Sequence, residues 1–231
     1  MEKLSENIKN VFQNIEKAAH LSGRDASDII LLAATKTVDP ERINAAINLG
    51  IEHIGENRVQ EFTEKYESIT KNAVHHFIGH LQSNKVKYLL PHISLIHSVE
   101  SEKLLDEIER ISKKHGKETS VLLEINASGE ESKFGIEFSE AEEFIKNNQK
   151  REYCKIKGLM TIGPNCHEEK AIRSAFKKMK ELFDTLSEKE YKNCEMKYLS
   201  MGMSGDYEIA IEEGANIVRV GSAIFGARNY V

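Results

Sequence analysis

The stretch of sequence that decides the fold is Ile29-Ile30-Leu31-Leu32-Ala33-Ala34-Thr35-Lys36. Its unbroken apolar run, with the turn signal Asp39-Pro40 close behind, predicts a strand buried on both faces, as in a parallel sheet under helices. A lysine at the carboxyl end of such a strand lies where α/β folds carry their chemistry. A neutral amine there can condense with an aldehyde to form a Schiff base. Taken alone, Lys36 also fits a lysine that extends from the strand end to solvent.

Seven more strand candidates follow, separated by amphipathic helical stretches. The eight candidates are 29–35, 51–54, 75–78, 93–98, 119–126, 155–161, 196–200 and 216–220. Eight strands joined by helical crossovers predict an α/β fold, a single TIM-type (β/α)8 barrel over residues 29–231. Residues 1–28 add an extra N-terminal helix, indicated by apolar side chains at helical spacing, and the segment that leads into the barrel. A doubly wound open sheet is the competing arrangement, because periodicity does not reveal strand order.

Capping residues mark several helix boundaries. Asp39-Pro40 supplies an N-cap and a first-turn proline, and Ser139-x-x-Glu142 has the capping-box pattern. Two short helices are expected at 207–213 and 223–226, directly after the last two strand-end loops.

Composition and charge exclude several functional classes. The 231 residues carry a net charge of −5, which gives no electrostatic case for binding nucleic acid or an anionic membrane. Cys154, Cys166 and Cys194 have no CxxC spacing, so neither a disulfide framework nor a zinc site is expected. The chain opens without a signal peptide and has no apolar window long enough to span a membrane. We therefore expect a soluble, cytoplasmic protein.

Barrel geometry would place the loops that follow the strands on one face of the molecule. The expected loops after strands 2, 3, 6, 7 and 8 are 55–57, 79–80, 160–164, 200–206 and 221–222. The last two loops combine glycine with serine, at Ser204-Gly205 and Gly221-Ser222, where short helices begin. Small residues beside backbone N–H groups at these two places predict a phosphate site. One such loop alone would favour ordinary turn glycines, and it is the pair of loops in the two expected places that favours a phosphate site.

Arg219 lies between Val218 and Val220, so strand alternation points it into the barrel. A buried guanidinium needs an acceptor. Glu124 would be a structural partner, and a ligand heteroatom would be a functional one. Together, a Schiff-base lysine, a phosphate cradle and an inward arginine suggest pyridoxal phosphate, whose aldehyde, phosphate and ring nitrogen each find a partner.

The histidines do not predict a metal site. His75 and His76 are adjacent on a strand, so their side chains point to opposite faces. His80 and His97 are candidates for the mouth of the barrel. No HxH or HExxH spacing occurs, and we interpret the histidines as structural, with His80 as a candidate neighbour of the cofactor.

Six segments resemble the pyridoxal phosphate homeostasis proteins, also called the YggS or PROSC family. These segments are 33–36, 55–61, 76–85, 157–161, 199–206 and 218–228. They span nearly the whole chain in order. The resemblance implies a barrel like the N-terminal domain of alanine racemase. His75 departs from the family, which often has tryptophan there, and this leaves the packing of its strand open.

The resemblance also implies six contact residues for pyridoxal 5′-phosphate: Lys36, Asn57, Ser204, Arg219, Gly221 and Ser222. The lysine would hold the cofactor as a Schiff base, and the two serines with the glycine would hold its phosphate. The arginine would lie by the ring nitrogen and the asparagine near the ring.

The same residues bear on whether the protein is an enzyme. An arginine at the ring nitrogen disfavours its protonation and so weakens the cofactor as an electron sink. Fold-related racemases add a second domain that delivers a tyrosine base, and this chain ends at Val231 without one; Tyr207 and Tyr230 are the nearest replacements. We expect a non-catalytic protein that holds and hands over pyridoxal phosphate.

The carrier hypothesis implies transient contacts with apo-enzymes that depend on pyridoxal phosphate, an indirect role in amino-acid metabolism, and a monomer or weak homodimer. One alternative is a small pyridoxal phosphate-dependent racemase or lyase of the same fold. The other is an aldolase-type enzyme that forms the imine with its substrate and has no cofactor.

Overall fold

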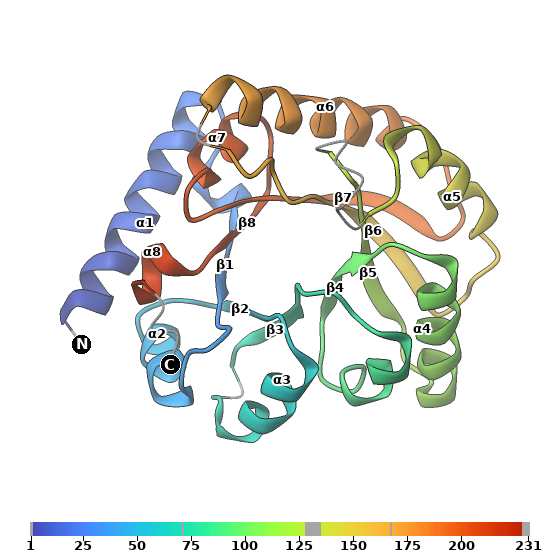
Figure 1. Ribbon diagram of the computed structural model, residues 1–231, viewed down its shortest axis with the longest axis horizontal. Coiled ribbons are helices and arrows are strands. Elements are labelled where there is room, and N and C mark those ends of the chain that lie inside the picture. Colours follow the sequence, from blue (N-terminus) through green and yellow to red (C-terminus); the bar gives the residue numbers. More distant parts are fainter. Residues whose placement is uncertain (1, 71, 128–134, 167, 228–231) are drawn as a thin grey trace.

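The centre of the molecule is a closed barrel of eight parallel strands in chain order, with β8 paired to β1 (Figure 1). The computed structural model describes residues 2–70, 72–127, 135–166 and 168–227. The strands are β1 (Ile30–Ala34), β2 (His53–Glu56), β3 (Val74–Phe77), β4 (Leu95–Val99), β5 (Thr119–Glu124), β6 (Cys154–Met160), β7 (Cys194–Met203) and β8 (Ile217–Val220). The closed ring confirms the predicted barrel and excludes the open sheet.

Helices form a layer around the outside of the barrel (Figure 1). The α-helices are α1 (Glu2–Leu21), α2 (Pro40–Asn48), α3 (Val59–Lys65), α4 (Glu102–His115), α5 (Ala141–Asn147), α6 (Glu169–Ser187), α7 (Tyr207–Glu212) and α8 (Ser222–Phe225). The described part of the chain also has four 3-10 helices: η1 (Ala26–Asp28), η2 (Tyr66–Ser68), η3 (Ser83–Tyr88) and η4 (Phe138–Glu140). None of the helices in these described ranges has an apolar stretch long enough to cross a bilayer.

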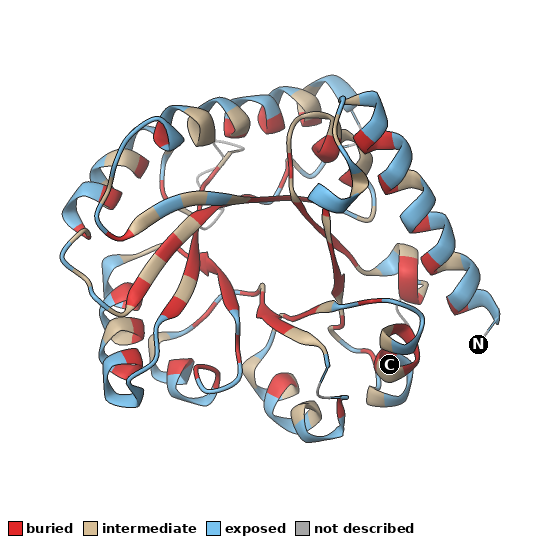
Figure 2. Ribbon diagram, turned by 180° about the vertical axis from the view of Figure 1, so that it is seen from behind, coloured by how far each residue is buried: buried red, intermediate tan, exposed pale blue. Residues whose placement is uncertain are grey.

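Most strand residues are buried because their side chains alternate between the barrel interior and the surrounding helices, although the first half of β7 is partly exposed. On β1, Leu32 belongs to a small cluster inside the barrel, whereas Leu31 and Ala33 pack into the larger core under the helices. Figure 2 shows that the strands are mostly buried, whereas the long helices are buried along one stripe only. The run that the sequence presents as continuously apolar therefore serves two separate cores.

Helix α1 lies outside the ring, beside α7 and α8 (Figure 1). Its buried stripe consists of Leu4, Ile8, Val11, Ile15, Ala18 and Ala19. Asn7 Nδ2 donates to the Ile224 carbonyl of α8 at 2.9 Å, and Arg24, just beyond α1, donates to the Ala215 carbonyl at 2.8 Å. The N-terminal helix thus braces, from outside, the two elements that follow the last strand-end loops.

Several predicted boundaries differ from the structure. The Asp39 cap is confirmed, because its side chain accepts from the Arg42 N–H and Pro40 begins α2. The Ser139 capping box is wrong: η4 runs directly into α5, whose N-cap residue is Glu140 and makes no side-chain capping bond. The crossover between β3 and β4 contains the 3-10 helix η3 where an α-helix was expected.

Two predicted loops prove to be partly strand. β2 extends through Glu56 and β7 extends through Met203, so 55–56 and 200–203 belong to strands. Helix α8 begins at Ser222, one residue earlier than predicted. Polar and glycine residues suggested loops at 55–56 and 200–203, but Glu56 and Ser200 have buried partners in the folded chain that periodicity does not show.

Candidate functional site

One cavity at the carboxyl end of the barrel brings together all six residues predicted to contact the cofactor. The cavity has a volume of about 270 Å³ and is lined by Ala34, Lys36, Asn57, Ile78, Ile162, Met203, Ser204, Gly205, Arg219, Gly221 and Ser222. Four strands, β1, β2, β7 and β8, deliver the six predicted residues, because parallel strands of a barrel end on the same face. A second cavity of about 220 Å³ also borders Lys36, Gly221 and Ser222.

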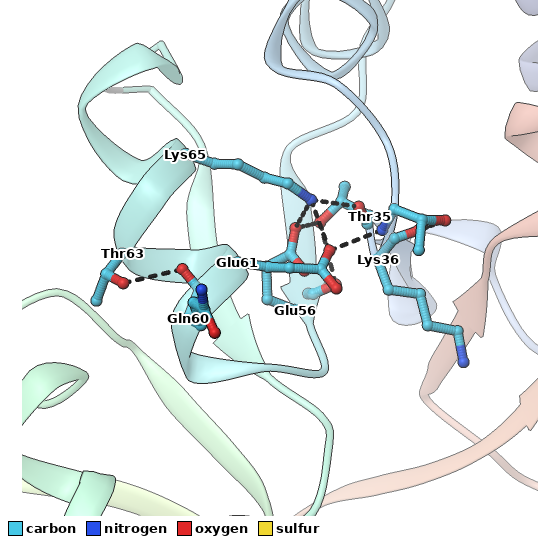
Figure 3. Close-up of polar contacts among 9 residues, drawn as sticks. Thr35, Lys36, Glu56, Gln60, Glu61, Thr63 and Lys65 are labelled. Atoms are coloured by element: carbon cyan, nitrogen blue, oxygen red, sulfur yellow. Dashed lines mark hydrogen bonds and ion pairs between the residues drawn. The ribbon is translucent and has the colours of Figure 1, made fainter. Parts of the chain in front are cut away.

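Lys36 is half-buried, and buried polar contacts hold the residue before it. Thr35 Oγ1 donates to Glu56 Oε1 at 2.7 Å, and Lys65 Nζ donates to the Thr35 carbonyl at 3.1 Å. Lys65 Nζ also forms an ion pair with Glu56 Oε1 at 3.0 Å. In Figure 3 the Lys36 side chain extends away from this group of residues. Helix α3 therefore anchors the end of β1 from outside while the lysine points the other way.

The residue after Lys36 is held as well. Thr37 has a φ of 63°, a left-handed conformation that residues other than glycine rarely adopt. Its N–H donates to Glu61 Oε2 at 2.8 Å, and Glu61 in turn pairs with Lys65 at 3.0 Å. Sequence reasoning did not assign Glu61 or Lys65 to the site. Their shared signal was an i, i+4 acid–base pair, which is usually a surface feature, although Glu61 also ends the segment 55–61 that resembles the family.

Ser204 joins the two glycine-serine loops. Its Oγ accepts from the Gly221 N–H at 3.0 Å and from the Ala223 N–H at 3.3 Å. The Met203 N–H donates to Asp206 Oδ1 at 2.6 Å and so fixes the start of this loop. With Ser204 Oγ already accepting from two amides, its own hydroxyl proton can be donated to a ligand in the cavity.

Arg219 points into the barrel, as alternation predicted, and is 5% exposed. It donates to the Ser200 carbonyl at 2.9 Å, to Ser200 Oγ at 2.8 Å and to the Thr161 carbonyl at 2.8 Å. These three bonds replace the direct partnership with Glu124 that we considered. Burial lowers the pKa of Arg219 to about 10, while the charges of Glu124 and Asp206 act in the opposite direction. The guanidinium therefore keeps its charge at neutral pH.

Glu124 ends β5 and is buried. Burial and the nearby charge of Glu100 raise its pKa to about 7, and Arg219 acts to lower it. Glu100 itself contacts His80, whose Nδ1 lies 3.2 Å from Glu100 Oε1. His80 is not among the residues that line the cavity.

Asn57 has an unsatisfied polar atom. Its Oδ1 is buried and has no hydrogen-bond partner among the described residues. Leaving such an oxygen unpaired costs about 1–3 kcal/mol, and in a native structure it calls for an explanation. Because Asn57 lines the cavity, a ligand that donates a hydrogen bond would satisfy it. The amine, hydroxyls, guanidinium and orphaned amide oxygen of this cavity fit a small phosphorylated aromatic aldehyde.

The structure separates the histidines from the site. His75 and His76 face opposite sides as predicted, His75 toward Phe62 of α3 and His76 into the barrel. The expectation that His97 lines the mouth is wrong, because it is fully buried against His76 inside the barrel. In the described chain, no group of three or more metal-ligating side chains is placed to hold an ion.

The tyrosines considered as catalytic bases do not line the cavity within the described residues. The hydroxyl of Tyr207 accepts from Asn14 Nδ2 at 3.0 Å, so it faces α1 and not Lys36. Tyr230 lies outside the described residues.

Comparisons with known proteins give a consistent set of relatives. The family model described as alanine racemase, N-terminal domain, matches residues 7–229. The pyridoxal phosphate homeostasis protein of Aquifex aeolicus (strain VF5) is 44% identical, over 97% of this chain and 98% of that protein. The crystal structure of an unknown protein from Bifidobacterium adolescentis has a TM-score of 0.92 at 38% identity, covering 97% of this chain and 95% of the other. PipY of Synechococcus elongatus PCC7942, solved with PLP bound, has a TM-score of 0.80 at 28% identity, covering 92% of this chain and 100% of that one.

Proposed function

The chain belongs to the pyridoxal phosphate homeostasis protein family, and we propose that it stores and hands over pyridoxal 5′-phosphate, held as a Schiff base on Lys36. The observation that carries this proposal is the convergence of six predicted contact residues, from four strand ends, on one cavity of about 270 Å³. The unpaired Asn57 Oδ1 in that cavity supports it. The match to relatives of that name extends over nearly the full length of both chains, so the proposal does not depend on a partial match.

Different residues of the cavity would contact different parts of pyridoxal phosphate. When bound, pyridoxal phosphate supplies a reactive aldehyde carbon joined to an electron-accepting ring. The Lys36 amine would supply the nitrogen that holds the aldehyde carbon as a Schiff base, with its two protons and the aldehyde oxygen released as water. The Ser204 hydroxyl and Ser222 would hold the phosphate, with Gly221 leaving room for its close approach, and Arg219 would lie by the ring nitrogen. Because Arg219 keeps its proton, it would donate a hydrogen bond to that nitrogen and disfavour its protonation.

A carrier role fits the site better than efficient catalysis. Racemisation and related reactions need an acid or base opposite the lysine, and the described lining of the cavity contains no tyrosine, histidine, aspartate or glutamate. Ile162 and Met203 line the cavity and are 42% and 40% exposed, so its rim is apolar and accessible. Such a rim suits transient contact with a cytoplasmic apo-enzyme that receives the cofactor.

The decisive experiment is the visible spectrum of the purified protein, before and after borohydride, with mass mapping of the modified peptide. We expect an imine absorption band that reduction fixes onto Lys36. Lys36→Arg should abolish the band and keep the fold, whereas Lys157→Ala, which removes a lysine outside the cavity, should keep both. A colourless wild-type protein that added pyridoxal phosphate cannot turn yellow would disprove the proposal.

A panel of amino acids tests the carrier role separately. The loaded protein should give no turnover above the rate of free pyridoxal phosphate, while transferring its cofactor to an apo-enzyme. Efficient racemisation or decarboxylation of any amino acid in the panel would replace the carrier with the alternative, a small racemase or lyase.

A further inference from the structure

Five polar side chains on β2, β3, β4, β7 and β8 form a continuous line of hydrogen bonds through the barrel. Arg219 Nη1 lies 2.8 Å from Ser200 Oγ, and Ser200 Oγ lies 3.0 Å from His97 Nδ1. His97 Nε2 lies 2.9 Å from His76 Nδ1, and His76 Nε2 lies 2.9 Å from His53 Nδ1. We call these five residues the inner chain. It runs from the cavity to His53, the first residue of β2, at the opposite end of the barrel.

The inner chain is set in one direction because it begins at an arginine. A guanidinium has donors only, so Ser200 Oγ must accept from Arg219. The serine proton then goes to His97 Nδ1, the acceptor within its reach in the described structure. A neutral histidine that accepts at Nδ1 carries its proton on Nε2, and the same assignment follows for the next two rings. Every proton along the line has an acceptor in this arrangement alone.

Burial keeps the middle of the inner chain neutral. Ser200 and His97 are both 0% exposed, and His76 is 4% exposed. Burial lowers the pKa of His76 to about 3 and that of His97 well below its usual value, with neighbouring positive groups acting in the same direction. An imidazolium beside Arg219 would also repel it. The rings therefore serve as neutral hydrogen-bonding groups, and a switch of direction would leave the buried serine proton without an acceptor.

We propose that the four residues beyond Arg219 act as one directional hydrogen-bonded chain that positions the guanidinium from inside the barrel. Ser200 is the key positioning residue, because within the described residues its hydroxyl makes the hydrogen-bonded link between the guanidinium and the rings. The Ser200 and Thr161 carbonyls supply the other two bonds of Arg219. With its hydroxyl rotamer locked by His97, Ser200 holds Nη1 in one orientation. This inference concerns the protein without ligand and stands independently of the proposed function.

The test is nitrogen NMR of the ligand-free protein, labelled with 15N in histidine and arginine. His53, His76 and His97 should each show a protonated Nε2 and an unprotonated Nδ1 at pH 8, with the rings assigned by single substitutions. The exposed His20 and His115 serve as internal references. A protonated Nδ1 on His76 or His97, or a charged ring at that pH, would overturn the proposal.

Two variants at opposite ends of the inner chain distinguish a directional chain from mere packing. Ser200→Ala removes the anchor, so all three rings should move toward mixed tautomers. Exchange of the Arg219 guanidinium protons with water should rise about tenfold, the effect of losing one hydrogen bond to a charged group. His53→Gln changes only the half-buried end of the inner chain, so His76 and His97 should keep their tautomers. This second variant still tests the proposal if Ser200→Ala fails to fold.

The matched control is Ser98→Ala. Ser98 is a buried serine beside His97 on β4, and its hydroxyl donates to the Gly79 carbonyl outside the inner chain. It should leave the three ring tautomers and the arginine exchange rate unchanged. A change confined to His97 in Ser200→Ala, or equal effects of Ser200→Ala and Ser98→Ala, would reject the chain as a single unit.

Discussion

Glycine occupies two positions near the cavity, 79 and 221, for different reasons. A Cβ at Gly79 would overlap the backbone carbonyl of Asn57, so this glycine lets the β2 and β3 loops touch. A Cβ at Gly221 would lie 3.4 Å from Ala34, an ordinary contact, and its φ of −116° suits any residue. The protein itself therefore does not require glycine at 221, and close approach of a ligand remains as its reason.

Alanine at each position tests that difference. Gly79→Ala should lower the free energy of unfolding by on the order of 2 kcal/mol, because the backbone must shift. Gly221→Ala should leave it nearly unchanged and weaken binding of pyridoxal phosphate more than of pyridoxal. Urea unfolding and equilibrium binding measure the two effects. Equal affinity of Gly221→Ala and wild type for the phosphorylated ligand would contradict the assignment of this glycine.

Glu124 gives a pH-dependent prediction. Its pKa is about 7 in the folded protein, above the ordinary value of 4.5, so its stabilising effect is complete below pH 4.5 and is lost as pH rises through 7. Between pH 4 and pH 8, Glu124→Gln should gain about 3 kcal/mol of unfolding free energy relative to wild type. Urea unfolding of both proteins at several pH values measures this difference. A constant difference between them would show that the carboxyl titrates normally.

At the scale of elements, helix α3 controls the strand end that carries Lys36. The Lys65 and Glu56 side chains are 13% and 3% exposed, so their ion pair is buried. Burial raises the pKa of Glu56, and Lys65 acts to lower it. A buried pair of this kind adds little over apolar residues, but removing one partner leaves the other charge uncompensated. The pair is therefore best understood as a device that sets the position of β1 against α3.

Removing the lysine alone should be costly. Lys65→Ala should lower the free energy of unfolding at pH 7 by about 3 kcal/mol, because Glu56 is then buried without its cation. The double variant Glu56→Gln/Lys65→Met should recover much of that loss and still bind pyridoxal phosphate more weakly, since Thr35 loses the lysine contact. If urea unfolding finds the single and double variants equally stable, the cost does not come from the buried charge.

At the scale of the whole molecule, the cavity joins parts of the chain that are far apart in sequence. β1 and β8 meet only because the barrel closes, with Leu32 beside Arg219 in the register. Helix α1 then braces α7 and α8, which follow the two glycine-serine loops. A ligand that bridges Lys36 and Ser204 therefore links the ends of β1 and β7, which lie on either side of β8 in the ring.

Ligand binding should accordingly stabilise the entire fold. Pyridoxal phosphate at 100 times its Kd should raise the free energy of unfolding by about 2.7 kcal/mol, and the melting temperature by roughly 5–10 °C. Lys36→Arg should lose most of this increase, and pyridoxal should give a smaller one. A thermal shift that is the same in wild type and Lys36→Arg would place the bound ligand away from Lys36.

Sequence patterns predicted the architecture well because the strands and long helices of the barrel each have a local hydrophobic pattern. Each strand shows as a short apolar run, and each long helix shows as an apolar stripe. The boundaries at Glu56 and Ser200 were missed because a polar residue at a strand end looks like a loop until its buried partner is known. The Ser139 cap failed for a related reason: the pattern matched, but a 3-10 turn led into α5 and took its place.

The amino-acid order by itself indicated the eight strands, the helix that precedes them and six of the residues that line the cavity, since side-chain periodicity and sequence motifs are properties of neighbours in the chain. Only the tertiary structure decided what those residues touch. The contacts of Lys65 that anchor β1 join residues 9 and 30 positions apart in sequence. The hydrogen bonds of His97 behind Arg219 join residues 21 and 103 positions apart. Such contacts arise when the ring of strands closes, and no local pattern encodes them.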